Sequence, residues 1–178
     1  MPKRTIEVPL LPLPDVPNIQ GVIFPKDSLD NAIEVFMDGT AQYVMLQKEN
    51  QLGDGNADIE LGKICGSVNN ITFDEVSKSY IATVKLIPNK NSAFVLDEIS
   101  KGINFTLGTN KVGMLAAIQE DDDTEYPEGT LYKCDKGFEI VSTSMFDTNL
   151  IKPQDSTDGK SDTEAYIPWE WSKCLEYY

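Results

Sequence analysis

Short runs of apolar residues, each about the length of a β-strand, place the strongest constraint on the fold of this chain. They are rich in β-branched and aromatic residues and are bounded by glycine, proline or asparagine, a pattern that predicts strands. Helical spacing is confined to two segments, so a sheet is expected to dominate the fold. The predicted strands are residues 41–47, 59–68, 79–87, 103–107, 112–118, 130–133 and 138–145.

The clearer of the two helical stripes begins at Leu29, from which apolar residues recur at i+3, i+4, i+7 and i+8 as far as Met37. Pro25 precedes the stripe and Gly39 follows it. Proline is favoured at the start of a helix and glycine just after its end. The pattern therefore predicts a helix between these two residues.

A second helix is predicted over residues 92–101, with Asn91 or Ser92 as its start signal and Gly102 as its end. Two helices among about seven short strands indicate the α+β class. Because the strands are short and separated by turns, we expect a predominantly antiparallel, barrel-like sheet.

Segments of different composition flank the predicted β-rich domain, which spans residues 21–152. Residues 1–20 are expected to form an extended arm, because prolines interrupt their apolar run. Residues 153–166 are polar and are expected to be a loop or linker. The arm carries three leucines that need an apolar surface to lie against, in this chain or in a partner, and they are Leu10, Leu11 and Leu13.

Aromatic residues gather in the final segment, residues 167–178. Clustered tryptophan and tyrosine side chains are typical of surfaces that pack against another surface, because they combine large apolar area with a polar atom. We therefore predict that this aromatic tail docks, within the chain or on a partner. The residues concerned are Trp169, Trp171, Tyr177 and Tyr178.

The charge of the chain excludes several classes of partner. It has 15 basic and 29 acidic residues, which give a formal net charge of −14. Arg4 is the single arginine. Such a chain repels nucleic acid unless a local basic and aromatic patch exists, and the sequence contains no such run. A membrane partner is not expected either, because no apolar stretch approaches the roughly 20 residues that span a bilayer.

The sequence has no histidine, which excludes Ser-His and Cys-His catalysis and imidazole-bound zinc. It also lacks the glycine-rich nucleotide motifs and the nucleophile elbow of hydrolases, so no cofactor is expected. Its cysteines, Cys65, Cys134 and Cys174, are widely spaced and are expected to be reduced thiols of a cytosolic fold.

Two acidic stretches are candidates for metal sites. Residues 54–60 begin like a calcium loop, but Ile59 stands where the loop needs glycine and Cys65 where it needs a bidentate glutamate. Residues 120–125 are consecutive acids, which are typical of a solvated turn. We therefore expect no metal site.

A further pattern links segments spread between residues 21 and 153. Their sequences are GVIFPKDSLDNAI (21–33), LGKICGSV (61–68), SYIATVKLIP (79–88), SAFVLDEISKGINFTLG (92–108) and FEIVSTSMFDTNLIKP (138–153). In order and spacing these segments resemble the tailed-phage prohead, or capsid maturation, proteases. The resemblance implies a prohead-protease-like domain.

The resemblance also implies which positions would be catalytic. The family's histidine corresponds to Gly66, which has no side chain to accept a proton, and its nucleophilic serine corresponds to Thr106. The arginine-glycine pair that follows the serine in the family is not reproduced here. A Ser-Lys type of dyad needs no histidine, but no motif places a lysine beside Thr106. We therefore expect no enzyme activity.

The expected function is that of a non-enzymatic phage virion protein, such as a capsid decoration, cement or scaffold-associated protein. Its partners would be capsid or other virion proteins, or further copies of itself. It would be located in the virion and, during assembly, in the cytoplasm of the infected bacterial host. Two alternatives stay open, namely an acidic inhibitor that mimics DNA and an active capsid maturation protease.

Overall fold

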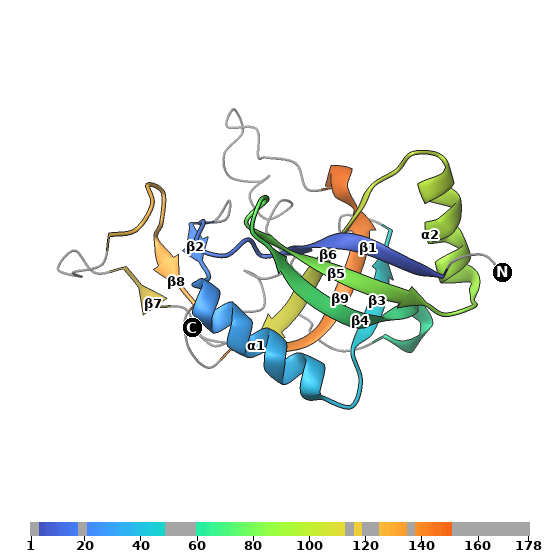
Figure 1. The fold of residues 1–178 in the computed structure, drawn as a ribbon, viewed down its shortest axis with the longest axis horizontal. Coiled ribbons are helices and arrows are strands. Elements are labelled where there is room, and N and C mark those ends of the chain that lie inside the picture. Colours follow the sequence, from blue (N-terminus) through green and yellow to red (C-terminus); the bar gives the residue numbers. More distant parts are fainter. Residues whose placement is uncertain are drawn as a thin grey trace.

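Six strands close into a barrel in the computed structural model, which describes residues 4–17, 21–48, 60–112, 116–118, 125–134 and 138–150. The barrel strands are Thr5–Leu11 (β1), Tyr43–Gln47 (β3), Ile64–Asp74 (β4), Ser79–Leu86 (β5), Phe105–Val112 (β6) and Glu139–Asp147 (β9). Around the barrel they follow the order β1-β5-β4-β3-β9-β6, and β6 pairs with β1 to close it (Figure 1). The α+β class and the barrel-like sheet are thus confirmed.

Most contacts around the barrel are antiparallel, but two are parallel. Strands β1, β5, β4 and β3 pair successively in antiparallel fashion, as do β6 and β9. Strand β3 runs parallel to β9, and β1 runs parallel to β6. Both parallel contacts join the N-terminal half of the chain to the C-terminal half, and no local sequence pattern indicates such a pairing.

Side chains alternate across each strand, so one set fills the barrel. On β5 this set comprises Tyr80, Ala82, Val84 and Leu86, and on β1 it comprises Val8 and Leu10. Leu107 on β6 lies in register with Leu10 and is buried on the same side. These residues belong to one continuous apolar core.

Helix α1 (Lys26–Asp38) begins and ends as its sequence pattern predicts, with Pro25 as N-cap and Gly39 as C-cap. The predicted stripe supplies its buried residues and packs on the barrel beside β9. Burying such a stripe stabilises a short helix far more than its intrinsic propensity does. The buried residues of α1 are Leu29, Ala32, Ile33 and Phe36.

Helix α2 (Lys90–Ser100) connects β5 to β6 and begins earlier than predicted. Its N-cap is Asn89, whose side chain accepts a hydrogen bond from the Ser92 amide, while the Ser92 hydroxyl accepts one from the Asn89 amide. The predicted start signal, Asn91 or Ser92, therefore lies inside the helix. This capping box uses two polar residues three apart, and the sequence pattern alone does not say which of them is the cap.

A second, smaller sheet lies at the end of the barrel opposite α2 (Figure 1). It contains β2 (Val22–Ile23), β8 (Tyr132–Lys133) and β7 (Ala116–Ala117), with β8 in the middle. The predicted strand 112–118 is thus divided, because Val112 ends β6 and only two later residues enter this sheet.

Three strand predictions need correction. The residues expected to separate two strands, 108–111, lie in the middle of β6. Residues 61–63 form a 3-10 turn, and β4 continues beyond Val68 to Asp74 because it forms a hairpin with β5. On β9, strict strand alternation over the predicted strand 138–145 would place Ser142 on the same face as Ile140, but a register shift around Val141 places them on opposite faces.

The predicted N-terminal arm is extended, but part of it belongs to the barrel. Strand β1 pairs with β5 over six residues and closes the barrel through β6. The boundary expected at residue 20 therefore does not separate an arm from the domain. Proline in the arm is compatible with this role, since Pro9 lies in register with Ile81 without having to donate a ladder hydrogen bond.

Candidate functional site

Gly66, which the sequence resemblance matches to the family's catalytic histidine, has no room for a side chain. It lies on β4 in register with Leu86, and a Cβ added to it would overlap the carbonyl oxygen of Lys85. The same Cβ would lie 3.2 Å from the Cα of Leu86. Both neighbours are backbone atoms of β5, so they cannot move aside as a flexible side chain could. The glycine is required by the close approach of the two strands.

Thr106, which the sequence resemblance matches to the family's nucleophilic serine, is 3% exposed. Its hydroxyl lies 2.7 Å from that of Thr148, and either can be the donor. A hydroxyl becomes a good nucleophile when a base accepts its proton, and threonine is not such a base. The contact with Thr148 therefore holds Thr106 in place without activating it.

The two positions face opposite sides of the barrel wall. Gly66 is in register with Leu86 and with Val44, both of which face the interior. Thr106 precedes the inward-facing Leu107 and is in register with Phe146, so it points to the other side. Any side chain at residue 66 would consequently point away from the hydroxyl of Thr106.

A lysine does lie beside a threonine in the barrel, but the threonine is Thr109. The Lys111 ammonium donates a 2.8 Å hydrogen bond to Thr109 Oγ1, and that hydroxyl donates to the carbonyl oxygen of Leu11 over 3.1 Å. Lys111 also lies 4.8 Å from the ring centroid of Phe24, and both Thr109 and Lys111 are buried. The lysine is a donor here, whereas a general base must accept the hydroxyl proton.

Sequence reasoning missed this buried lysine. Its signal was available, because strand alternation over 105–111 places Lys111 on the same face as the apolar Phe105 and Leu107. On the other face of β6, Asn110 donates hydrogen bonds of 3.0 and 2.9 Å to the hydroxyls of Ser142 and Ser144. That network joins β6 to β9.

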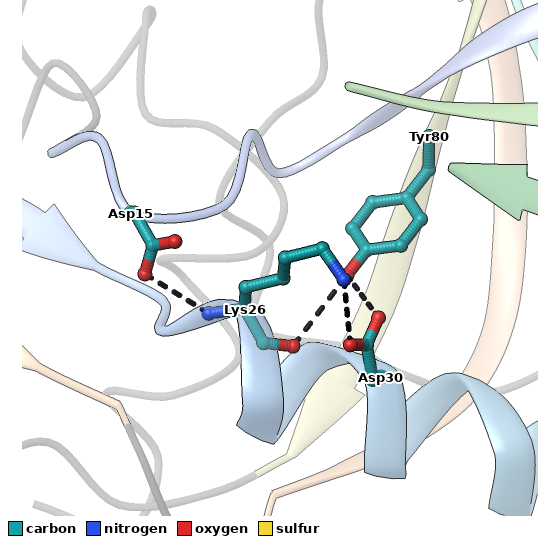
Figure 2. Close-up of polar contacts among 4 residues, drawn as sticks. All are labelled: Asp15, Lys26, Asp30 and Tyr80. Atoms are coloured by element: carbon teal, nitrogen blue, oxygen red, sulfur yellow. Dashed lines mark hydrogen bonds and ion pairs between the residues drawn. The ribbon is translucent and has the colours of Figure 1, made fainter. Parts of the chain in front are cut away.

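A third polar cluster joins α1 to the barrel (Figure 2). Lys26 forms a 2.8 Å ion pair with Asp30, its backbone amide donates to Asp15, and Asp30 accepts a 2.5 Å hydrogen bond from the hydroxyl of Tyr80. The Lys26 ammonium lies 4.4 Å from the ring centroid of Phe73. The turn after β1, the start of α1 and the β4–β5 hairpin are thereby connected.

The charges in this cluster shift the pKa values of its members. Burial opposes the ionisation of Asp30, but hydrogen bonds from Lys26 and Tyr80 outweigh burial and hold its pKa below the usual range. Burial and the neighbouring Asp30 carboxylate raise the pKa of Tyr80 far above that of a free tyrosine. At neutral pH the pair is therefore an ionised carboxylate and a neutral phenol, which suits the observed hydrogen bond.

The predicted docking residues of the arm differ in exposure. Leu10 is buried in the barrel, Leu11 is half-buried and Leu13 is 41% exposed. Val16, a few residues further on, is 51% exposed. The apolar surface that Leu10 needs is thus supplied by its own chain. The predicted docking residues of the tail, Trp169, Trp171, Tyr177 and Tyr178, lie outside the described residues.

The described residues contain no group of three or more acidic, cysteine or histidine side chains that could hold a metal ion. The acidic stretches at 54–58 and 120–124 lie outside the described residues. Within the described part of the chain no helix is long and apolar enough to cross a membrane. Cys65 and Cys134 are buried thiols, and burial raises the pKa of Cys65 to about 12.

The fold is similar to that of a capsid assembly protease. One solved structure of similar fold is the bacteriophage T4 capsid assembly protease, gp21, which matches with a TM-score of 0.60 over 80% of each chain at 14% sequence identity. At this identity the likeness concerns the fold alone. The sequence matches no family profile and none of the curated proteins. This likeness supports the prohead-protease-like fold that the sequence motifs imply.

Proposed function

We propose that this chain is a non-enzymatic structural or assembly protein of a phage virion, built on the prohead-protease-like fold. The observation that carries the proposal is the close approach of β5 to Gly66, which leaves no space for a catalytic base. An acyl-transfer site without a base loses orders of magnitude in rate. The burial of Thr106 supports the same conclusion.

The proposed partners are capsid or other virion proteins, to which the chain would bind as a decoration, cement or scaffold-associated protein. The bacteriophage T4 protein of similar fold is described as acting in capsid assembly. Docking would use Leu11 and Leu13 of the arm together with the aromatic residues of 167–178, and Leu10 has no part in it because it is buried. The chain would accordingly be found in the virion and, during assembly, in the host cytoplasm.

Co-sedimentation tests this proposal. The purified chain is mixed with empty shells and with scaffold-containing procapsids of the phage that carries its gene, and the pellet is analysed for both binding and cleavage. We expect the chain to pellet with one of the particles and all partner chains to remain intact. Replacing Trp169 and Trp171 by alanine should reduce the pelleted fraction. The matched control is Val76→Ser, which changes an apolar side chain that is 93% exposed in the turn between β4 and β5.

Two outcomes would overturn the proposal. One is a chain that stays in the supernatant with every particle tested. The other is specific cleavage of shell or scaffold protein that is abolished by Thr106→Ala, which would instead support the active maturation protease.

The alternative of an acidic, DNA-mimicking inhibitor rests on the net charge of −14. Its binding to a nuclease or repressor would weaken steeply as salt is added, since it would depend on many exposed charges. Docking through leucine and tryptophan side chains should hardly respond to salt. A salt titration of whichever complex forms therefore separates the two functions.

A further inference from the structure

Two pockets flank the first turn of α2, and Lys90 lines both of them. The first, about 370 Å³, is also lined by Lys48 and Lys63. The second, about 410 Å³, has a mainly apolar wall with Arg4 among its lining residues. The apolar wall is formed by Leu86, Pro88, Ala93 and Leu96. A cationic pocket and an apolar pocket thus adjoin beside α2. Helix α2 lies at one end of the barrel (Figure 1).

The cations of this region have few carboxylate partners. Among the described residues, Lys63 pairs with Glu60 at 2.9 Å, whereas Arg4, Lys48 and Lys90 have no acidic side chain within ion-pair distance. The Lys48 ammonium lies 4.5 Å from the centroid of the Phe94 ring. In a chain with a net charge of −14, such a cluster is a local attraction for carboxylates.

The chemistry of the two pockets specifies an acidic peptide with large apolar side chains. The lysine ammonium groups suit carboxylates, and the apolar wall suits an aromatic ring, over whose face Arg4 can also lie. Nucleic acid fits less well, because the net charge of −14 on the rest of the molecule would repel it.

We propose that residues 162–171 of this chain occupy this pair of pockets. Their sequence, DTEAYIPWEW, has three carboxylates and three aromatic rings and no cation. The eleven residues between Leu150 and this segment can extend over roughly 35–40 Å, which is comparable to the width of a small domain. Glu164 and Glu170 meet the lysines, and Trp169 or Trp171 lies against the apolar wall.

The chain provides its own probe for this contact, because Trp169 and Trp171 are its two tryptophans. Tryptophan emission and its quenching by neutral acrylamide in the full-length chain therefore report on this segment. We expect the tryptophans to be protected in the unaltered chain. The double charge reversal K48E/K90E should expose them and weaken the contact roughly tenfold or more, since two attractions become repulsions.

The matched control is K78E/K101E, which changes the net charge equally but alters lysines that pair with acids elsewhere. It should leave quenching unchanged. The double reversal E164K/E170K should expose the tryptophans, and combining it with K48E/K90E should restore their protection. Such a rescue is not expected of variants that merely unfold, and circular dichroism checks that each variant is folded.

Three results would overturn the inference: tryptophans that are fully quenched in the unaltered chain, protection that survives K48E/K90E, or failure of the combined charge swap to restore it. The inference does not depend on the proposed function, because it concerns the isolated chain. Docking on a shell would compete with this contact, so a chain that pellets with shells but has unprotected tryptophans in isolation contradicts the inference alone.

Discussion

The hydroxyl of Tyr80 donates a 2.5 Å hydrogen bond to Asp30 Oδ1 and so joins the barrel to α1 across 50 residues of sequence. Tyr80 is a residue of β5, on the face that points into the barrel. Asp30 also pairs with Lys26 within α1 (Figure 2). The Tyr80 ring packs edge-on against Phe73, with a centroid separation of 5.2 Å. The position of α1 on the barrel is therefore fixed by a specific polar contact in addition to its apolar stripe.

Removing this hydroxyl should destabilise the fold. For Tyr80→Phe we expect a loss of about 1–2 kcal/mol in the free energy of unfolding, because a hydrogen bond to a carboxylate disappears while the ring is kept. Urea denaturation measures the change. Tyr43→Phe is the matched control, since the described residues give the Tyr43 hydroxyl no hydrogen bond. Equal stability of the two variants would show that the contact contributes nothing.

The Asp30 carboxylate should make stability depend on pH in the acid range. Its pKa in the folded chain lies below the usual value of 3.8, so the unfolded chain binds the proton first as pH falls. The stabilisation by the Asp30 carboxylate is fully present above about pH 5, roughly one unit above the pKa of the unfolded chain. It is lost as the pH falls through the lower pKa of the folded chain. The stability difference between the unaltered chain and Asp30→Asn should consequently be constant near neutral pH and shrink below about pH 4. A difference that stays constant down to pH 2 would contradict this assignment.

The close approach at Gly66 predicts that even a methyl group is not tolerated there. Gly66→Ala should lower the free energy of unfolding by about 2 kcal/mol or more, because β4 and β5 must separate to relieve the overlap with Lys85. Gly62→Ala is the control, since a Cβ at that position has no neighbour within 4 Å. Thermal denaturation of both variants measures the difference. If Gly66→Ala melted together with Gly62→Ala, there would be room at residue 66 after all.

The buried thiols should be unreactive in the folded chain. With a pKa of about 12, the Cys65 thiol is ionised in roughly one molecule in ten thousand at pH 8, and the thiolate is the reactive form. In a Cys174→Ser variant we therefore expect no rapid labelling by a thiol reagent until urea unfolds the chain, when Cys65 and Cys134 both react. Rapid labelling of the folded variant would mean that one of these sites opens readily.

The sequence by itself determined the elements whose signals are local. The stripe from Leu29 to Met37 became α1, with Pro25 and Gly39 as its caps. Strand β5 begins at Ser79 as predicted and ends one residue early, at Leu86. These features follow from side-chain periodicity and from residues that start or stop an element, which act over a few neighbouring positions. The sheet-dominated α+β class followed from the same local signals.

The tertiary structure alone decided which strands meet and what lies beside each candidate residue. Thr143 on β9 donates a hydrogen bond to the carbonyl oxygen of Tyr43, which lies 100 residues away in sequence, and β1 closes the barrel against β6. The lack of space at Gly66 comes from β5, and the ring of Phe24, 4.8 Å from the Lys111 ammonium, comes from a segment distant in sequence. Register, closure and free volume depend on segments that are distant in sequence, so no local pattern can encode them.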